Sequence, residues 1–302
     1  LMLDPGFRIE FGSDRLLPAF CAGFNAGFVD YKYGVQMDEP QMVKFLARSG
    51  IDLEQSAVLL HRNGANWRGA GVALVALEDG AAWCSGLAVA PTLRGGGFGR
   101  RLMEAIQARA AAAGALTLWL EALVHNTPAR RLYASLGYQP RRDLLFWRTG
   151  APAGQFHDAS ELHAANVQEA LVAVYAWQHQ PPAWQRSQRA ITRYQDELWA
   201  YRLQDAGETA GWIICLPTAP HHPGQSRLRI MTLAVRPDAQ QTTLAHRLLA
   251  SLRAHRPDTV FTVINEPETS LFTAALQDNG FVEVDRQIEM VLALPVKVED
   301  PA

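Results

Sequence analysis

Residues 87–99 read Leu-Ala-Val-Ala-Pro-Thr-Leu-Arg-Gly-Gly-Gly-Phe-Gly, and this stretch decides the fold. An apolar, strand-like run ends at Pro91, a glycine-rich loop follows, and a helical pattern runs from Arg100 to Ala113. Glycine lets the backbone adopt positive φ and approach a ligand closely. The first amides of the next helix have no partners within it and lie at the positive end of its dipole. Strand, loop and helix together predict a site for a phosphate or diphosphate group.

Two familiar glycine-rich loops fit this stretch poorly. A P-loop places Lys-Ser/Thr directly after its last glycine, where this chain has Arg100 and Arg101. A dinucleotide fingerprint needs Gly-x-Gly-x-x-Gly, and counted from Gly95 its third glycine position holds Arg100. A third pattern, Arg/Gln-x-x-Gly-x-Gly/Ala, is matched by Arg94, Gly97 and Gly99.

This third pattern resembles the coenzyme A loop of the GNAT superfamily of N-acetyltransferases. Residues 87–91, Leu-Ala-Val-x-Pro, resemble the family's fourth strand, which a bulge splays away from its neighbour. Residues 126–138, Asn-x-x-Ala-x-x-x-Tyr-x-x-x-Gly-Tyr, resemble its second signature. The resemblance covers residues 7–148 and implies an enzyme that transfers an acetyl group from acetyl-CoA to a primary amine.

Composition describes a globular chain long enough for two domains, with 302 residues, of which 48% are hydrophobic and 19% charged. The net charge of −2 does not favour nucleic-acid binding, and no apolar run approaches the roughly eighteen residues of a membrane span. Cys21, Cys84 and Cys215 are widely spaced and odd in number, which suits a reducing cytoplasm. We expect a cytoplasmic monomer or homodimer without nucleic-acid or membrane partners. We also expect no metal, because His221-His222 lacks further ligands at metal-binding spacing.

The order of elements in the first half predicts an α/β fold with a mixed (α+β) sheet and helices on both faces. Apolar patterns indicate strands and capping residues indicate helix starts. The expected strands cover residues 7–11, 56–61, 69–77, 83–89, 116–123 and 144–148, and the helices begin near Ser13, Asp38, Arg100 and Thr127.

The second half of the chain repeats this plan. Leu-Ala-Val-Arg-Pro at 233–237 aligns with residues 87–91 at an offset of 146 (233 − 87), and six of the seventeen pairs from 87/233 to 103/249 are identical. Residues 149–155, Thr-Gly-Ala-Pro-Ala-Gly-Gln, are typical of a linker. We therefore predict two tandem GNAT-type domains, a catalytic one over 1–149 and a degenerate one over 150–302.

Two substitutions distinguish the halves. Thr243 stands at the position of Gly97, where a β-branched side chain prevents close backbone approach, and Phe272 stands at that of Tyr133 without its hydroxyl. We expect productive acetyl-CoA binding in the first half only. The second half would then complete the substrate cleft or stabilise the fold.

The resemblance implies the cofactor contacts. Backbone amides of the loop would hold the diphosphate, and the splayed strand would pair with the pantetheine arm and polarise the thioester carbonyl. Asn126 would contact the cofactor or a water, or cap the next helix. The expected cofactor-binding residues are Leu87, Ala88, Val89, Arg94, Gly95, Gly96, Gly97, Phe98, Gly99, Arg100 and Asn126.

Two residues are expected to move protons. The resemblance makes Tyr133 the acid that protonates the leaving thiolate, since a phenol with a pKa near 10 is protonated at neutral pH. Glu121, near the end of an apolar strand, is the candidate base, and His125 is a second one. A core tyrosine and a solvent-facing glutamate remain the plain alternatives.

The acceptor would lie against residues 24–33, a run that is rich in aromatic side chains and contains one acidic side chain. Asp30 could attract a cationic amine on a small molecule or peptide, while Phe28, Tyr31 and Tyr33 could line an apolar or cation–π surface. The same aromatic residues could instead seal the core. Two other functions remain open, a non-catalytic acyl-CoA-binding sensor and a transferase that uses a longer acyl-CoA.

Overall fold

The computed structural model describes residues 5–34, 36–149, 161–219 and 226–295. The chain divides into two compact units, unit 1 with Leu1–Arg141 and Glu289–Ala302, and unit 2 with Arg142–Ile288. The predicted linker, apart from Thr149, and His221-His222 lie outside the described residues.

Unit 1 has the predicted order of strands and helices. Asp38 caps its second helix in a capping box with Gln41. Ser13, by contrast, precedes a short 3-10 turn and makes no side-chain cap bond, so the first helix begins at Leu17 with Pro18 in its first turn. The elements are β1 (Phe7–Phe11), α1 (Leu17–Gly27), α2 (Glu39–Ser49), β2 (Ile51–Asn63), β3 (Asn66–Glu78), β4 (Ala81–Val89), α3 (Phe98–Ala112), β5 (Thr117–Leu123) and α4 (Thr127–Ser135).

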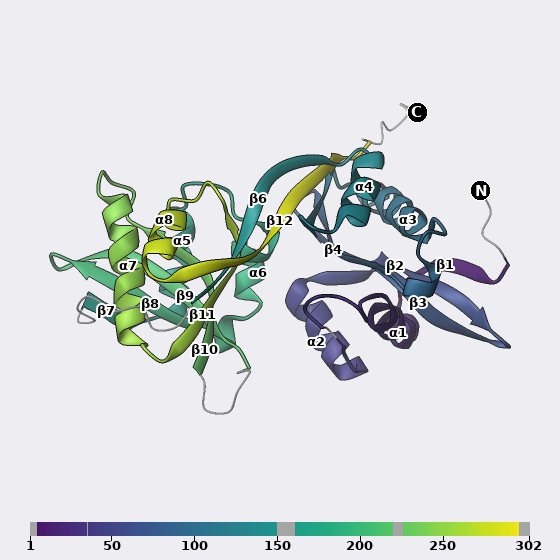
Figure 1. The fold of residues 1–302 in the computed structure, drawn as a ribbon, viewed down its shortest axis with the longest axis horizontal. Coiled ribbons are helices and arrows are strands. Elements are labelled where there is room, and N and C mark those ends of the chain that lie inside the picture. Colours follow the sequence, from purple (N-terminus) through teal and green to yellow (C-terminus); the bar gives the residue numbers. More distant parts are fainter. Residues whose placement is uncertain (1–4, 35, 150–160, 220–225, 296–302) are drawn as a thin grey trace, which may run out of the picture. The chain divides into compact units, whose positions relative to one another are not determined.

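The sheet of unit 1 is mixed, as predicted. Its strands follow the order β1-β2-β3-β4-β5, with the end of β12 (Phe281–Ala293) beside β5. β1 to β4 are antiparallel neighbours, whereas β4 and β5 run parallel. Apolar side chains of α1 and α2 pack on one face, and α3 and α4 lie over the other (Figure 1).

Unit 2 repeats this arrangement. Its sheet has the order β6-β11-β10-β9-β8-β7, with β10 and β11 parallel and the other described neighbours antiparallel. One core lies between the sheet and α5, and a second joins the sheet to α7 and α8. The elements are β6 (Gln139–Thr149), β7 (Leu162–Ala165), α5 (Val167–Ala176), α6 (Gln188–Thr192), β8 (Trp199–Asp205), β9 (Glu208–Pro217), β10 (Ser226–Val235), α7 (Gln241–His255), β11 (Thr259–Pro267) and α8 (Phe272–Asp278).

Two strands carry the chain from one unit into the other. β6 follows α4 in sequence, yet from Arg142 onward it belongs to unit 2, where Leu144–Arg148 pairs with β11. β12 returns the chain to unit 1 at Glu289, and there the Leu294 amide donates to the Leu116 carbonyl at 2.9 Å. The strand predicted at residues 144–148 therefore forms, but in the sheet of unit 2.

Candidate functional site

The candidate site begins where β4 and β5 separate. These strands pair in parallel as far as Cys84 and Leu120, and β4 then continues to Val89. The register between β3 and β4 shifts at Ser85, which forms a bulge. A bulge bends its strand and increases its twist. The end of β4 therefore diverges from β5, as the splayed strand of the resemblance implies.

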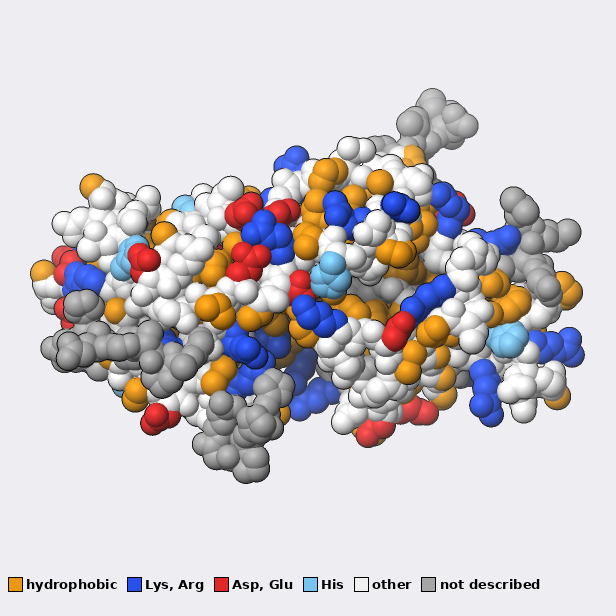
Figure 2. All heavy atoms as spheres, in the orientation of Figure 1, with side chains coloured by type: hydrophobic (Ala, Val, Ile, Leu, Met, Phe, Trp, Pro, Cys, Tyr) orange, Lys and Arg blue, Asp and Glu red, His pale blue; other side chains and the backbone are white. Residues whose placement is uncertain are grey.

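A cavity of about 780 Å³ adjoins the end of β4. Figure 2 shows the surface hollowed over β4, with hydrophobic side chains on its floor. The sequence-predicted residues that line it are Leu87, Ala88, Val89, Arg94, Gly95, Gly97, Phe98, Gly99, Arg100, Asn126, Phe28, Asp30 and Tyr31. Three predicted residues, Gly96, Tyr133 and Glu121, are not among its lining residues.

The glycine loop presents its backbone to the cavity. Gly95 and Gly97 both have φ of +81°, a region that glycine enters at little cost. Gly97 is the N-cap of α3 and the helix has no side-chain cap bond. The first amides of α3 are thus available to a ligand at the positive end of the helix dipole, which is the arrangement that binds phosphate groups.

Arg94 uses its side chain within the protein. Its Nη1 and Nη2 donate to the two carboxylate oxygens of Asp30 at 2.6 and 2.7 Å. Its Nε donates to the Val89 carbonyl and Nη2 also donates to the Gly27 carbonyl, each at 3.0 Å. Hydrogen bonding from Arg94 lowers the pKa of Asp30, so the pair stays charged at neutral pH. Asp30, expected to attract a cationic amine, instead has a cation of the protein as its partner.

Aromatic rings line the acceptor side of the cavity. Phe28 lies 4.6 Å from Phe24 and 5.3 Å from Tyr31, measured between ring centroids. Tyr31 in turn meets Tyr33 edge to face at 5.7 Å. Phe24 is buried in the core with α2, whereas Phe28 and Tyr31 line the cavity. The two interpretations of this run therefore apply to different residues, because the first ring seals the core and the later ones form a wall.

The start of α4 forms the opposite wall. Asn126 is its N-cap, and its Oδ1 accepts from the Ala129 amide at 3.3 Å. His125 lines the cavity as well. Asn126 is thus both a helix cap and a cavity residue, so its two expected roles occur together.

Tyr133 is a buried residue of α4, 6% exposed, and its ring lies 5.8 Å from that of Tyr138. Burial raises its pKa well above the usual value, and Cys84, Tyr138 and Tyr31 raise it further. Its phenol is therefore protonated throughout the neutral range. Tyr31 lines the cavity, and so does Leu132, which precedes Tyr133 on α4.

Glu121 lies on β5 two residues before Leu123, which lines the cavity, and the alternation of a strand places both on one face. Its Oε2 accepts from the Trp83 Nε1 at 2.8 Å. A carboxylate can take a proton, which is the chemistry expected of a base.

Sequence reasoning missed several lining residues, namely Leu93, Leu123, Pro128, Ala129 and Leu132, and it placed Gly27 and Lys32 in the acceptor run 24–33 without giving either a role. Gly27 shows what the sequence leaves out. A Cβ on Gly27 would lie 2.5 Å from the Cβ of Ala88, so this glycine lets α1 approach β4 closely. The approach joins residues far apart in the chain, and no local pattern signals it.

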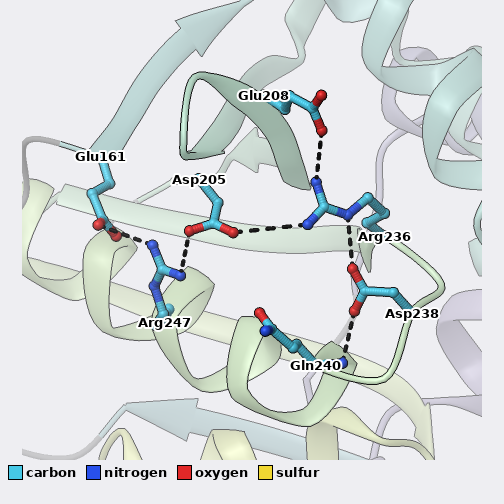
Figure 3. A network of polar contacts seen from close by, with 7 residues as sticks. All are labelled: Glu161, Asp205, Glu208, Arg236, Asp238, Gln240 and Arg247. Atoms are coloured by element: carbon cyan, nitrogen blue, oxygen red, sulfur yellow. Dashed lines mark hydrogen bonds and ion pairs between the residues drawn. The ribbon is translucent and has the colours of Figure 1, made fainter.

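The corresponding loop in unit 2 has a different backbone. The offset of 146 aligns the start of α3 with residue 244 (98 + 146), but α7 begins at Gln241, three residues earlier. Helix therefore replaces the glycine turn, and Thr243 lies inside it. A carboxylate also occupies the start of this helix, because Asp238 Oδ1 accepts from the Gln240 amide at 2.7 Å while Arg236 holds Oδ2 at 2.8 Å (Figure 3).

The cleft of unit 2 is filled by its own side chains. Arg186 and Glu266 form an ion pair at 2.6 Å, and both are nearly buried. The ring of His179 lies 6.1 Å from that of Phe272. These four residues line a cavity of about 30 Å³, which holds about one water molecule. The cavity of unit 1 is thus the larger and carries the glycine turn.

The residues around the unit 1 cavity fit a coenzyme A thioester. The turn and the uncapped start of α3 suit a diphosphate, and the end of β4 offers backbone beside an extended arm. Among the described residues, no group of three side chains is placed to hold a metal ion, and no helix is long and apolar enough to cross a membrane.

Comparisons with known proteins agree with this geometry. Residues 40–138 match the model of the acetyltransferase (GNAT) family. None of the curated proteins matches the chain. A GCN5-related N-acetyltransferase from Sphaerobacter thermophilus is similar in structure, with a TM-score of 0.67, 19% sequence identity and 98% of each chain covered.

Two further solved structures extend the likeness. A tandem GNAT protein from the clavulanic acid biosynthesis pathway gives a TM-score of 0.63 at 17% identity, over 96% of this chain and 100% of that one. N-myristoyltransferase from Saccharomyces cerevisiae, with bound myristoyl-CoA, gives a TM-score of 0.62 at 12% identity, over 98% of this chain and 81% of that one. The predicted α/β fold and its tandem GNAT plan are confirmed. Residues 40–138 thus match the GNAT family, and the chain as a whole shares the fold of these solved GNAT proteins.

Proposed function

We propose that the first half of the chain, residues 1–149, is an N-acetyltransferase that moves an acetyl group from acetyl-CoA to a primary amine in a ternary complex. The second half, residues 150–302, is a degenerate GNAT-like domain. One observation carries the proposal. The cavity of unit 1 joins the glycine turn to the splayed end of β4, so a single ligand could reach both. The match of residues 40–138 to the GNAT family supports acyl transfer in general.

The chain's own groups divide the chemistry. Thioesters supply an activated acyl group. The amides of Gly95 and of Gly97 to Gly99 would bind the diphosphate, and the backbone of Leu87 to Val89 would hold the pantetheine arm and polarise the thioester carbonyl. Holding amine and thioester side by side supplies the proximity advantage.

Two side chains then move protons. As the amine nitrogen forms its bond to the carbonyl carbon and the carbon–sulfur bond breaks, Tyr133 gives its phenolic proton to the leaving sulfur. Glu121, directly or through a water, takes the proton that the amine loses. The neutral, buried phenol suits the acid, and the carboxylate beside Trp83 suits the base.

Calorimetric titration with acetyl-CoA, paired with a thiol-release screen of amines, tests the proposal. We expect one site per chain and thiol release with at least one small-molecule or peptide amine. Binding without thiol release across the panel would favour an acyl-CoA sensor. Two equivalent sites would contradict the degenerate second half.

A longer acyl group is a second candidate, because a structural neighbour is a myristoyl-CoA enzyme. The same screen with longer acyl-CoAs decides between them, since the better donor gives the higher kcat/KM.

A cytoplasmic location belongs to the proposal as well, and is supported by Cys21, Cys84 and Cys215, which are buried and form no disulfide.

A further inference from the structure

The segment between α1 and α2, Phe28–Gly34, forms the aromatic wall of the cavity, and we call it the acceptor segment. Its base is fixed by Asn25, whose Nδ2 donates to the Met37 carbonyl at 2.7 Å and whose Oδ1 accepts from the Met37 amide at 2.9 Å. Two hydrogen-bonded turns shape the segment. The Tyr31 amide donates to the Phe28 carbonyl at 3.0 Å, and the Gly34 amide donates to the Tyr31 carbonyl at 2.9 Å.

A second attachment holds the middle of this segment. Asp30 meets the guanidinium of Arg94 through both carboxylate oxygens. Arg94 is also the first residue of the cofactor loop pattern, and its Nε and Nη2 bond the carbonyls of Val89 and Gly27. One side chain therefore ties together the acceptor segment, the end of α1, the end of β4 and the glycine loop.

The hydrogen-bond capacity of Arg94 limits what else it can do. A guanidinium has five N–H donors, and four of them are used by Gly27, Val89 and the two oxygens of Asp30. One donor is left for a phosphate oxygen. The carboxylate also neutralises the guanidinium charge at contact distance. Arg94 is thus built as a connector, and diphosphate binding is left to the amides of the loop.

We propose that Asp30 and Arg94 are positioning residues that couple the two subsites, so that a cofactor bound at the loop orders the acceptor segment. The inference rests on the proposed function, since it needs a diphosphate at the loop. A ligand that fixes the loop backbone fixes the start of the Arg94 side chain, and the bidentate pair carries that restraint to Asp30. Coupling of this kind is reciprocal, so an acceptor held by the segment tightens the cofactor by the same factor.

Hydrogen exchange of the full chain, with and without acetyl-CoA, tests the coupling. In the unsubstituted protein we expect acetyl-CoA to slow exchange in the loop and also in residues 28–34. In Asp30→Asn the loop should still gain protection, whereas the acceptor segment should lose most of its gain. The affinity for acetyl-CoA should fall by about fivefold or less, because an exposed ion pair contributes little by itself.

Two variants make the test specific. Asp30→Glu keeps the charge and should restore part of the protection. Glu10→Gln removes an equivalent exposed ion pair, with Arg8 on β1, and should leave the response unchanged. With an acceptor in hand, Asp30→Asn should raise the acceptor KM more than the acetyl-CoA KM.

The outcomes separate the inference from the proposed function. A protein that does not bind acetyl-CoA would overturn both. Binding that protects the loop but leaves residues 28–34 unchanged would overturn the coupling alone.

Discussion

Among single residues, Tyr133 carries the sharpest test of the chemistry. Its phenol is neutral because burial raises its pKa well above the usual value. We expect Tyr133→Phe to lower thiol release about 10²-fold, the usual size of a lost general acid, with little change in acetyl-CoA affinity. Because the pKa is raised, the acid stays protonated and activity should not fall through its ionisation below about pH 10. Steady-state thiol release against pH measures both effects.

Tyr138→Phe is the matched control for this prediction. Tyr138 is also buried, its pKa is raised by burial, and Gln107 donates to its hydroxyl at 3.4 Å. Tyr138→Phe removes the same kind of hydroxyl, leaves the Tyr133 phenol in place and keeps the ring that lies 5.8 Å from it. Equal losses in the two variants would show that packing, not proton donation, explains the effect at Tyr133.

Glu121 is tested by removing its carboxylate. A base must be able to take a proton and an amide cannot, so Glu121→Gln should lower kcat about 10²-fold. Trp83→Phe removes the hydrogen bond at 2.8 Å but keeps the carboxylate, and should retain most activity. Steady-state thiol release measures both variants. Full activity in Glu121→Gln would assign the base elsewhere, with His125 next.

Sequence predicted which residues meet at the site better than it predicted what each one contacts. The loop and strand residues were identified because glycines and a helix start have local signatures, and nearly all of them line the cavity. The partner of Asp30 was not predictable, since Arg94 lies 64 residues further along the chain. A charge in a sequence indicates a possible partner of opposite sign, and the fold chooses between a ligand and the protein itself.

Among the elements, the glycine turn before α3 is the part that a single methyl group can disable. Gly97 has φ of +81°, and a Cβ added there would meet no atom within 4 Å, so Gly97→Ala adds backbone strain without a clash. Non-glycine residues in this region cost about 1–2 kcal/mol. If the turn must keep this shape to bind diphosphate, acetyl-CoA affinity should fall about tenfold. Calorimetry measures the change.

Gly80→Ala separates strain from binding. Gly80 has φ of +76°, equally open surroundings and a place in the turn between β3 and β4, and it does not line the cavity. The two variants should lower thermal stability alike, and only Gly97→Ala should weaken acetyl-CoA binding. Equal affinities would show that the turn does not hold the cofactor.

The same element marks the limit of prediction in the second half. Thr243 indicated that the glycine turn was lost, because a β-branched side chain is stiff and bulky there. The sequence did not show that α7 would begin at Gln241 and absorb the turn. Without glycine to enter positive φ, the residues continue the helix, and the carboxylate of Asp238 satisfies an amide at its start. The sequence showed the substitution of Thr243 for a glycine, whereas the conversion of the loop into helix depends on all of the loop residues together.

At the scale of the whole molecule, the sequence did not predict which unit each of the strands β6 and β12 belongs to. The apolar pattern at residues 144–148 predicts a strand, and the strand forms, but a pattern of alternating side chains does not name the neighbour with which it pairs. Unit 1 takes its last strand residues from Glu289 onward, and unit 2 begins at Arg142. Unit 1 is thus built from two separated parts of the chain, and unit 2 is formed by the part between them.

This connectivity predicts that residues 1–149 are insufficient alone, although they contain every residue lining the cavity. Without residues 289–302 the sheet of unit 1 lacks the strand beside β5, and Leu116 loses its bond from Leu294. We expect the 1–149 fragment to unfold without a cooperative transition and to bind acetyl-CoA far more weakly than the full chain, by thermal melting and calorimetry. Joining 1–141 to 289–302 through a flexible linker of about 15 residues, which spans roughly 20 Å, should restore both properties. A 1–149 fragment with the affinity of the full chain would show that the returning strand is dispensable for the site.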